Sequence, residues 1–143
     1  MSEYLFAYGT LQPGLAPGEM TSLVAELAPA GRGFVRGLLY DFGHYPGAIL
    51  DPKSTQKIFG AVLRLPESPD FLPTLDAYEE FDPSALEQSQ FIRTAHAVTL
   101  ESGGDLLCWV YVYNRDPGDA RVVEGGLWMN RREMPGNAVK NPG

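Results

Sequence analysis

Glycine and proline break up the apolar segments of this chain at short intervals. The 143 residues include 16 glycines and 12 prolines, a spacing that favours several strands joined by tight turns over long helices. Two of the apolar segments also carry an internal glycine, Gly37 and Gly60, which is typical of a bulge or a close approach between two backbones. The pattern predicts an α+β fold, with a small mixed β-barrel or strongly curved sheet and short flanking helices.

The individual segments follow from apolar periodicity and turn signals. Gly103-Gly104 predicts a hairpin between the last two strands. After Asn114 the pattern weakens, so we expect one domain over 1–114 and a C-terminal extension over 115–143, with a packed segment near 125–132 and a loose tail. Strands are predicted over the first half of Tyr4–Leu11, Gly33–Phe42, Ala48–Leu50, Lys57–Leu65, Phe91–Leu100 and Leu106–Tyr113; helices are predicted over Glu19–Ala28, ended by Pro29 and Gly31, and from about Phe71; loops are predicted over Asp41–Gly47 and Asp51–Thr55.

Charge and composition exclude several classes of function. The net charge of −7 argues against nucleic-acid and anionic-membrane partners, both of which need clustered Lys and Arg. Cys108 is the single cysteine, and the two histidines, His44 and His96, are far apart, so we expect no disulfide, no metal site and no cofactor. Glu3 and Gly9 interrupt the start that a signal peptide would need, and we expect a cytoplasmic protein.

The stretch Tyr4–Leu11 is the first candidate for a functional site. Its apolar first half predicts a buried strand, and Gly9 followed by Gln12-Pro13-Gly14 ends that strand abruptly. Thr10 adds a hydroxyl at the break, and backbone amides left unpaired there would bind an anion or a carbonyl oxygen. By itself the stretch also fits an ordinary strand and turn.

The second candidate is Leu75–Phe81, where three carboxylates are mixed with large apolar side chains. Asp76 and Glu79 are three residues apart and share a helical face, whereas Glu79 and Glu80 do not. One of the two glutamates is expected to point inward, where apolar walls raise the pKa of a carboxyl group and suit it to general acid/base chemistry. The alternative is the end of an amphipathic helix with solvated acids.

Taken together, these motifs resemble the γ-glutamylcyclotransferase-like family, in particular its small bacterial-type and γ-glutamylamine cyclotransferase-like members. The resemblance spans residues 4–114. It is carried by Tyr8-Gly-Thr-Leu11, Gly37–Pro46, Gly60–Leu63, Phe91-Ile-Arg93, Trp109-Val-Tyr111 and Leu75-Asp-Ala-Tyr-Glu-Glu-Phe81 in that family's arrangement.

The resemblance implies a small mixed barrel and a cavity that binds a small γ-glutamyl compound. It implies that the enzyme releases 5-oxoproline and an amine, and that Glu79 is the general acid/base. The residue after this acid is commonly glycine in the family and is Glu80 here, so Glu80 stays an alternative to Glu79. The substrate-binding loop would be Tyr8, Gly9, Thr10 and Leu11; further candidates are Glu80, Tyr45, Arg93, Tyr111 and Tyr113.

Two other functions remain open from the sequence. One is a different lyase or acyl-transfer reaction in the same cavity, and the other is a small-molecule binding module without catalysis. The tyrosines fit core packing as well as a cavity wall, and Arg93 fits either an ion pair near the site or a strand surface.

Overall fold

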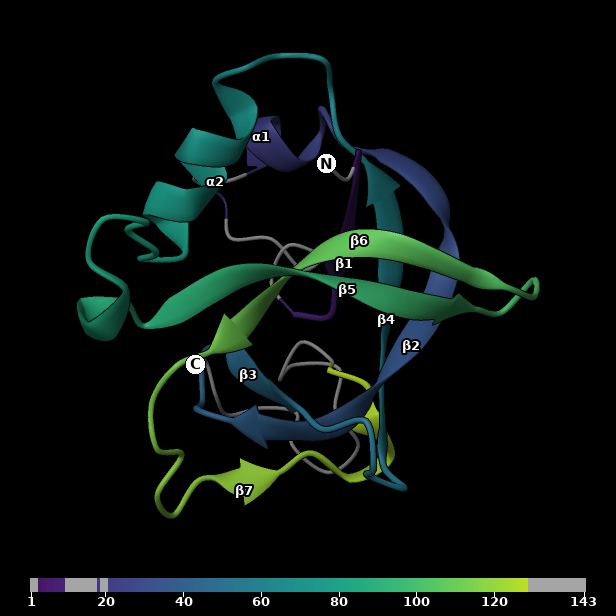
Figure 1. Ribbon diagram of the computed structural model, residues 1–143, viewed down its shortest axis with the longest axis vertical. Helices are drawn as coiled ribbons and strands as arrows, with labels where there is room; N and C mark the ends of the chain where they lie inside the picture. The colour runs from purple at the N-terminus through teal and green to yellow at the C-terminus, as the bar shows by residue number, and fades with distance from the viewer. Residues whose placement is uncertain (1–2, 10–17, 19–20, 129–143) are drawn as a thin grey trace.

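The computed structural model describes residues 3–9, 18 and 21–128, and they form a β-barrel with two short helices at one end (Figure 1). The barrel and short helices predicted from the sequence are confirmed. The strands are β1 (Tyr4–Ala7), β2 (Ala28–Asp41), β3 (Pro46–Leu50), β4 (Lys57–Arg64), β5 (Phe91–Leu100), β6 (Asp105–Tyr113) and β7 (Arg121–Val122); the helices are α1 (Thr21–Val24) and α2 (Phe71–Tyr78), and 3₁₀ turns cover η2 (Leu86–Gln88) and η3 (Glu124–Gly126).

Five strands close the barrel in the order β2-β4-β1-β6-β5, and β5 returns to pair with β2. The pairing of β1 with β6 is parallel, with Leu5 opposite Trp109, and the other four pairings are antiparallel. The sheet is therefore mixed, as predicted. Closure leaves these five strands with partners on both sides, which removes the exposed edges that would otherwise attract another chain.

The long strand β2 belongs to two pairings. Its first part pairs with β4, and its last part, from Gly37 to Asp41, pairs with β3. The close approach predicted at Gly37 is confirmed, because a Cβ atom there would lie 2.3 Å from the carbonyl oxygen of Ile49. Strand β7 pairs with the end of β2, and β3 and β7 lie at the opposite end of the molecule from α1 and α2 (Figure 1).

Side chains of β1 alternate between two core clusters, as strand periodicity requires. Leu5 and Ala7 belong to a cluster that includes residues of α1 and α2, and Phe6 and Tyr8 belong to a second cluster. The second cluster also contains Cys108, which is buried with its pKa raised to about 11 by desolvation, consistent with an unreactive core thiol. Trp128, in the predicted C-terminal extension, is buried in the same cluster. The domain boundary at residue 114 stays a prediction.

Two of the differences from the predicted element boundaries place a proline inside a strand. Of the helix predicted over Glu19–Ala28, the described residues form α1, which ends at Val24, and Ala28 already pairs with Arg64 in β4. Pro29 is tolerated there because the register shifts between Pro29 and Gly31, a bulge at which no ladder donor is needed. Pro46, predicted to lie in a loop, is the first residue of the edge strand β3, a position that also tolerates proline.

Candidate active site

The C-terminal end of α2 carries the two candidate acids. The N–H of Glu80 donates to the carbonyl oxygen of Ala77 at 3.2 Å, and the N–H of Phe81 donates to that of Asp76 at 2.8 Å. These two bonds form a Schellman motif, in which the residue after the C-cap adopts a positive φ and is usually glycine. Glu80 occupies this position with a φ of 57°. The helix therefore ends at Tyr78, Glu79 is the C-cap, and the chain reverses at Glu80.

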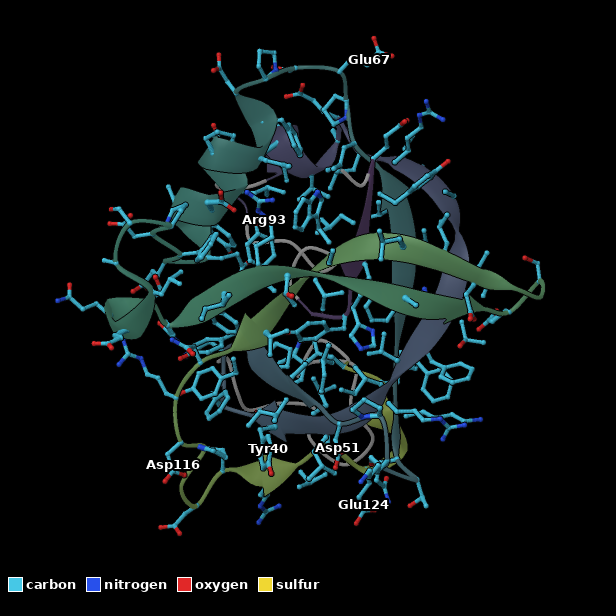
Figure 2. The ribbon with its side chains drawn as sticks, in the orientation of Figure 1. Tyr40, Asp51, Glu67, Arg93, Asp116 and Glu124 are labelled. Atoms are coloured by element: carbon cyan, nitrogen blue, oxygen red, sulfur yellow. The ribbon has the colours of Figure 1, made fainter. Side chains whose placement is uncertain are left out.

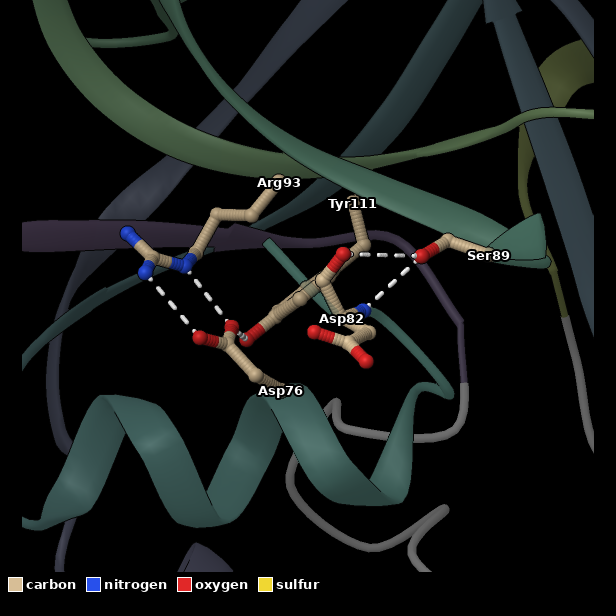
Figure 3. A network of polar contacts seen from close by, with 5 residues as sticks. All are labelled: Asp76, Asp82, Ser89, Arg93 and Tyr111. Atoms are coloured by element: carbon tan, nitrogen blue, oxygen red, sulfur yellow. Dashed lines mark hydrogen bonds and ion pairs between the residues drawn. The ribbon is translucent and has the colours of Figure 1, made fainter. Parts of the chain in front are cut away.

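Asp76 lies one turn before this end and is fixed by two strands (Figure 3). Its carboxylate accepts from Nε and Nη2 of Arg93 on β5, at 2.8 and 3.0 Å, and from the hydroxyl of Tyr111 on β6, at 2.7 Å. Asp76 is only 5% exposed, so both of its oxygens are satisfied away from water. Such bidentate, charge-assisted bonds hold α2 at a defined position on the barrel.

The Arg93 side chain completes this attachment between helix and sheet. Figure 2 shows it reaching between α2 and the strands, whereas Glu67 and Asp116 lie on the periphery. Its guanidinium lies 4.4 Å from the centre of the Trp109 ring and 5.9 Å from that of Phe81. The bonds to Asp76 also raise the pKa of Arg93, so it stays charged. Arg93 therefore forms the ion pair near the site that was one of its two predicted roles.

A cavity of about 250 Å³ lies beside this helix end. It is bounded by the end of β1 and the two residues that follow it, by the loop before β3 and the first residue of β3, by the end of α2, and by residues at the start of β5 and in β6. The described residues that line it are Phe6, Ala7, Tyr8, Gly9, His44, Tyr45, Pro46, Tyr78, Glu79, Glu80, Gln90, Phe91 and Tyr111.

Gly9 and Tyr8 shape the wall contributed by the end of β1. A Cβ atom at Gly9 would lie 2.6 Å from Cγ of Pro46, so only glycine fits beside this proline. The Tyr8 hydroxyl donates to the carbonyl oxygen of Tyr111 at 2.5 Å and accepts from the N–H of Ala48 at 3.2 Å. Burial raises the pKa of Tyr8, and the Glu79 carboxylate raises it further, so its hydroxyl stays protonated. Tyr8 therefore ties β1 to β6 and β3 at the cavity.

Glu79 differs in its surroundings from the other carboxylates near the cavity. Among the described residues none donates a hydrogen bond to its side chain, and neither of the ion pairs between these residues includes it. Desolvation raises its pKa from 4.5 to about 7, and the like charge of Glu80 contributes to the increase. A carboxyl group with this pKa exchanges protons readily near neutral pH, as a general acid/base must.

The structure brings most of the predicted site residues together. Tyr8, Gly9, Tyr45, Glu79, Glu80 and Tyr111 all line the cavity. Two of the predicted residues lie beside it rather than in its wall: Arg93 pairs with Asp76, and Tyr113 packs against the rings of Phe42 and Phe91. Thr10 and Leu11 lie outside the described residues. Of the two glutamates, Glu79 is the partly buried one and Glu80 is exposed.

Sequence reasoning missed several residues of the cavity wall. Gln90 donates to the Tyr45 hydroxyl at 2.7 Å, and its N–H donates to the Glu80 carbonyl oxygen, so it ties the helix end to the loop before β3. Its position just before a predicted strand is the signal that could have found it. His44, which the sequence analysis considered only as a metal ligand, also lines the cavity. In the described part of the chain no group of His, Cys, Asp and Glu side chains is arranged to hold a metal ion, and no described helix is both long and apolar enough to cross a membrane.

Comparison with known proteins agrees with this geometry. The chain is 34% identical over 113 residues to the gamma-L-glutamyl-butirosin B gamma-glutamyl cyclotransferase of Niallia circulans, which covers 78% of this chain and 67% of the relative. An AIG2-like protein of Mus musculus has the same fold, with a TM-score of 0.72 at 24% identity over 98% of this chain and 95% of that one. YkqA of Bacillus subtilis matches with a TM-score of 0.65 at 20% identity, over 90% of this chain but 40% of YkqA. The model of the family described as "Gamma-glutamyl cyclotransferase, AIG2-like" matches residues 5–130, and the chain belongs to this family of enzymes.

Proposed function

We propose that this enzyme converts a small γ-glutamyl compound into 5-oxoproline and a free amine, with Glu79 as the general acid/base. The observation that carries the proposal is the position of Glu79 in the cavity wall with a pKa of about 7. The family membership of the chain supports the class of reaction. The relative from Niallia circulans is named for a γ-glutamyl substrate, which supports a γ-glutamyl group as the part of the substrate held in this cavity.

The reaction needs little from the protein beyond geometry and proton transfer. The substrate's α-nitrogen attacks its own γ-carbonyl carbon, so the new C–N bond closes a five-membered lactam and the original C–N bond to the leaving amine breaks. Two protons leave the α-ammonium group: one reaches the departing nitrogen, and the other is released to solvent. Because the nucleophile is already tethered, holding the substrate in the ring-closing conformation supplies much of the rate, roughly 7–11 kcal/mol in well-oriented intramolecular reactions.

Glu79 can mediate both proton transfers. As a carboxylate it takes a proton from the α-ammonium group, which frees the nitrogen lone pair for attack. As a carboxylic acid it then gives that proton to the leaving nitrogen. A group whose pKa lies near 7 performs both steps without a large penalty in either direction. No covalent intermediate with the protein is required.

The end of β1 is proposed to hold the substrate's oxygens. Gly9 lies in the cavity wall against Pro46, so a substrate can approach the backbone there closely. We propose that the amides of Gly9, Thr10 and Leu11 bind the substrate carboxylate or the oxyanion that develops on the γ-carbonyl. Removal of one donor from such a site typically costs about 2.7–4 kcal/mol of transition-state stabilisation. The net charge of −7 is consistent with a small-molecule substrate rather than a nucleic acid, and we propose a cytoplasmic location.

A panel of γ-glutamyl compounds assayed for 5-oxoproline release tests the proposal. We expect at least one to turn over, and we expect Glu79→Gln to lower the rate by about 10²- to 10⁴-fold, the usual contribution of general acid/base catalysis. Glu80→Gln is the matched control because it makes the same chemical change one residue further on. The assignment is wrong by one residue if Glu80→Gln is inactive while Glu79→Gln is not.

The same panel distinguishes the other two functions. A binding module without catalysis would bind γ-glutamyl compounds in calorimetry and release no 5-oxoproline. A different lyase or acyl-transfer reaction in this cavity would consume the substrate and release the amine without forming the lactam. Circular dichroism of Glu79→Gln separates loss of chemistry from loss of folding.

A further inference from the structure

Glu80 lies on the boundary between the cavity and a second hollow. It is one of the residues that line the 250 Å³ cavity, and it also lines a more open hollow of about 710 Å³ on the other side of the α2 end. The second hollow is bounded by residues of α2, by the segment from Phe81 to Ser89, and by Arg93. A molecule that extends out of the cavity past the end of α2 therefore passes the Glu80 side chain.

The two hollows differ in the part of a substrate that they suit. Pockets that enclose a whole small molecule are usually about 300–1,000 Å³. The first cavity, at about 250 Å³, is slightly smaller and suits a compact group such as the γ-glutamyl moiety. With the reacting carbonyl held beside Glu79, a leaving amine that extends toward the second hollow passes the neighbouring residue. The residue next to Glu79 that lines both hollows is Glu80, and it is exposed.

The charges around the two hollows are unbalanced. Arg93 is the only Lys or Arg among the described residues that line them, and its bidentate bonds to Asp76 satisfy its charge. Asp82 accepts hydrogen bonds from the N–H and the hydroxyl of Ser84 in its own turn. Neither of the ion pairs between described residues includes Glu80. Glu80 and Glu79 thus present two adjacent carboxyl groups without a cationic partner in this part of the chain.

The backbone at Glu80 points to the same conclusion. A Schellman turn favours glycine at this position, because a side chain at φ 57° costs roughly 1–2 kcal/mol. Here the position carries a carboxylate instead, next to another carboxylate whose pKa it raises. Both effects are unfavourable in the free enzyme. A positively charged group on the substrate would offset the repulsion between the two carboxylates.

Because Glu80 lines both hollows, we infer that it forms a subsite for a positive charge on the leaving amine. The enzyme then prefers γ-glutamyl derivatives of diamines or of other amines that carry a second ammonium group. This inference rests on the proposed cyclotransferase reaction, because in that reaction the leaving amine receives its proton from Glu79, the residue next to Glu80. Glu80 acts as a specificity-determining residue, and Glu79 remains the residue that moves protons.

A matched series of substrates tests the inference. γ-Glutamyl-cadaverine, γ-glutamyl-hexylamine and γ-glutamyl-aminohexanoate have leaving amines of similar length that end in an ammonium, a methyl or a carboxylate group. We expect kcat/KM of the wild type to decrease in that order, with the ammonium compound preferred over the methyl compound by about fivefold, as for one solvent-accessible ion pair. The preference should appear mainly in KM and weaken as salt is added.

Variants then assign the preference to Glu80. At about pH 8, above the pKa of Glu79, Glu80→Gln is expected to bring the ratio of kcat/KM for the ammonium and methyl compounds close to one. The ratio is the readout because any change in the chemistry common to both substrates cancels. Glu67→Gln, which removes a charge from a residue that lines neither hollow, is expected to keep the ratio of the wild type.

The outcomes separate this inference from the proposed function. If all three compounds turn over at equal rates, or if Glu80→Gln keeps the wild-type ratio, the subsite is wrong and the cyclotransferase proposal stands. If none turns over but calorimetry shows tighter binding of the ammonium compound that Glu80→Gln abolishes, the subsite is supported and the proposed reaction is wrong. Absence of both turnover and this binding preference overturns both.

Discussion

Asp76 and Glu79 lie one helical turn apart on the same short segment, yet their surroundings are opposite. Asp76 receives two hydrogen bonds from Arg93 and one from Tyr111, all within 3.0 Å, and is buried. Glu79 faces the cavity with no hydrogen-bond donor among the described residues, beside the like charge of Glu80. In the sequence these are two acids three residues apart, and only the fold makes them different.

The difference shows why Asp76 suits a structural role and Glu79 suits the proposed role in proton transfer. The partners of Asp76 hydrogen-bond to both of its carboxylate oxygens, so it serves as a fixed anchor between α2 and the strands. Desolvation without such partners stabilises the neutral form of Glu79 and brings its pKa to about 7. A carboxyl group can be an anchor or a proton carrier, and the donors around it decide which.

The largest expected effect is on stability and comes from breaking the anchor. Asp76→Asn leaves the partly buried Arg93 guanidinium without a carboxylate, and loss of one partner of a buried ion pair costs up to about 3–5 kcal/mol. Urea unfolding followed by circular dichroism measures this change. We also expect 5-oxoproline release to fall, because Glu79 sits at the end of the helix that Asp76 holds in place.

An exposed ion pair in the same protein provides the comparison. Arg64 and Glu3 lie 3.2 Å apart with side chains that are 52% and 70% exposed. Such pairs are worth about 0–1 kcal/mol, so Glu3→Gln is expected to change stability little. If Asp76→Asn costs no more than Glu3→Gln, the anchor described above does not exist.

The second prediction concerns how Glu79 makes the free energy of unfolding depend on pH. Its pKa is raised from 4.5 to about 7, so the folded state holds a proton that the unfolded state releases in that range. The contribution of Glu79 to stability is therefore fully present below about pH 4.5 and is lost as the pH rises through 7. Glu79→Gln lacks this loss and is expected to be about 1–3 kcal/mol more stable than the wild type above pH 7.

Unfolding of both proteins at a series of pH values checks this second prediction. The two curves should run parallel below about pH 4.5 and diverge up to about pH 7. A difference that is independent of pH would mean that Glu79 titrates at an ordinary value, as a solvated acid would. Such a result would also remove the main support for its role as acid/base.

The barrel was predictable because its signals are local. The alternation in Phe91–Leu100 and the apolar run in Leu106–Tyr113 match β5 and β6 almost residue for residue, and Gly103-Gly104 forms the turn between them. Errors arose where a long-range partner overrode a local signal. Pro29 was interpreted as a helix terminator, but the pairing of β2 with β4 takes it into a strand at a bulge.

The site was predictable only in part, because it depends on which elements meet. That one glutamate of the pair would point inward followed from its apolar neighbours, but the choice of Glu79 came from a family resemblance. The partner of Asp76 could not be deduced, because Arg93 lies seventeen residues away on a strand whose placement requires the closed barrel. His44 and Gln90 reach the cavity for the same reason, through β-sheet pairings that span tens of residues.

The third prediction concerns the backbone at Glu80. Glycine adopts a φ of 57° without strain, so Glu80→Gly is expected to stabilise the protein by about 1 kcal/mol relative to Glu80→Ala. Both variants remove the charge, and only the alanine variant keeps the Cβ atom, so the difference between them isolates the backbone term. Equal melting temperatures for the two variants would show that Glu80 is unstrained at this turn.

The smallest expected effect tests how Glu80 acts on Glu79. Desolvation is the main cause of the raised pKa of Glu79, and the charge of Glu80 is the second. The acidic limb of the pH profile of kcat/KM reports ionisations of the free enzyme and the free substrate. We therefore expect this limb near pH 7 in the wild type and at a somewhat lower pH in Glu80→Gln. The titration of the substrate's own amine is common to all variants, so the difference between variants belongs to the enzyme.

Glu67→Gln should leave the limb in place, because a remote charge on the surface is screened by salt. A limb that stays in place in Glu80→Gln would mean that Glu79 owes its pKa to burial alone, and the contrast with Asp76 would then rest entirely on the missing hydrogen-bond donors.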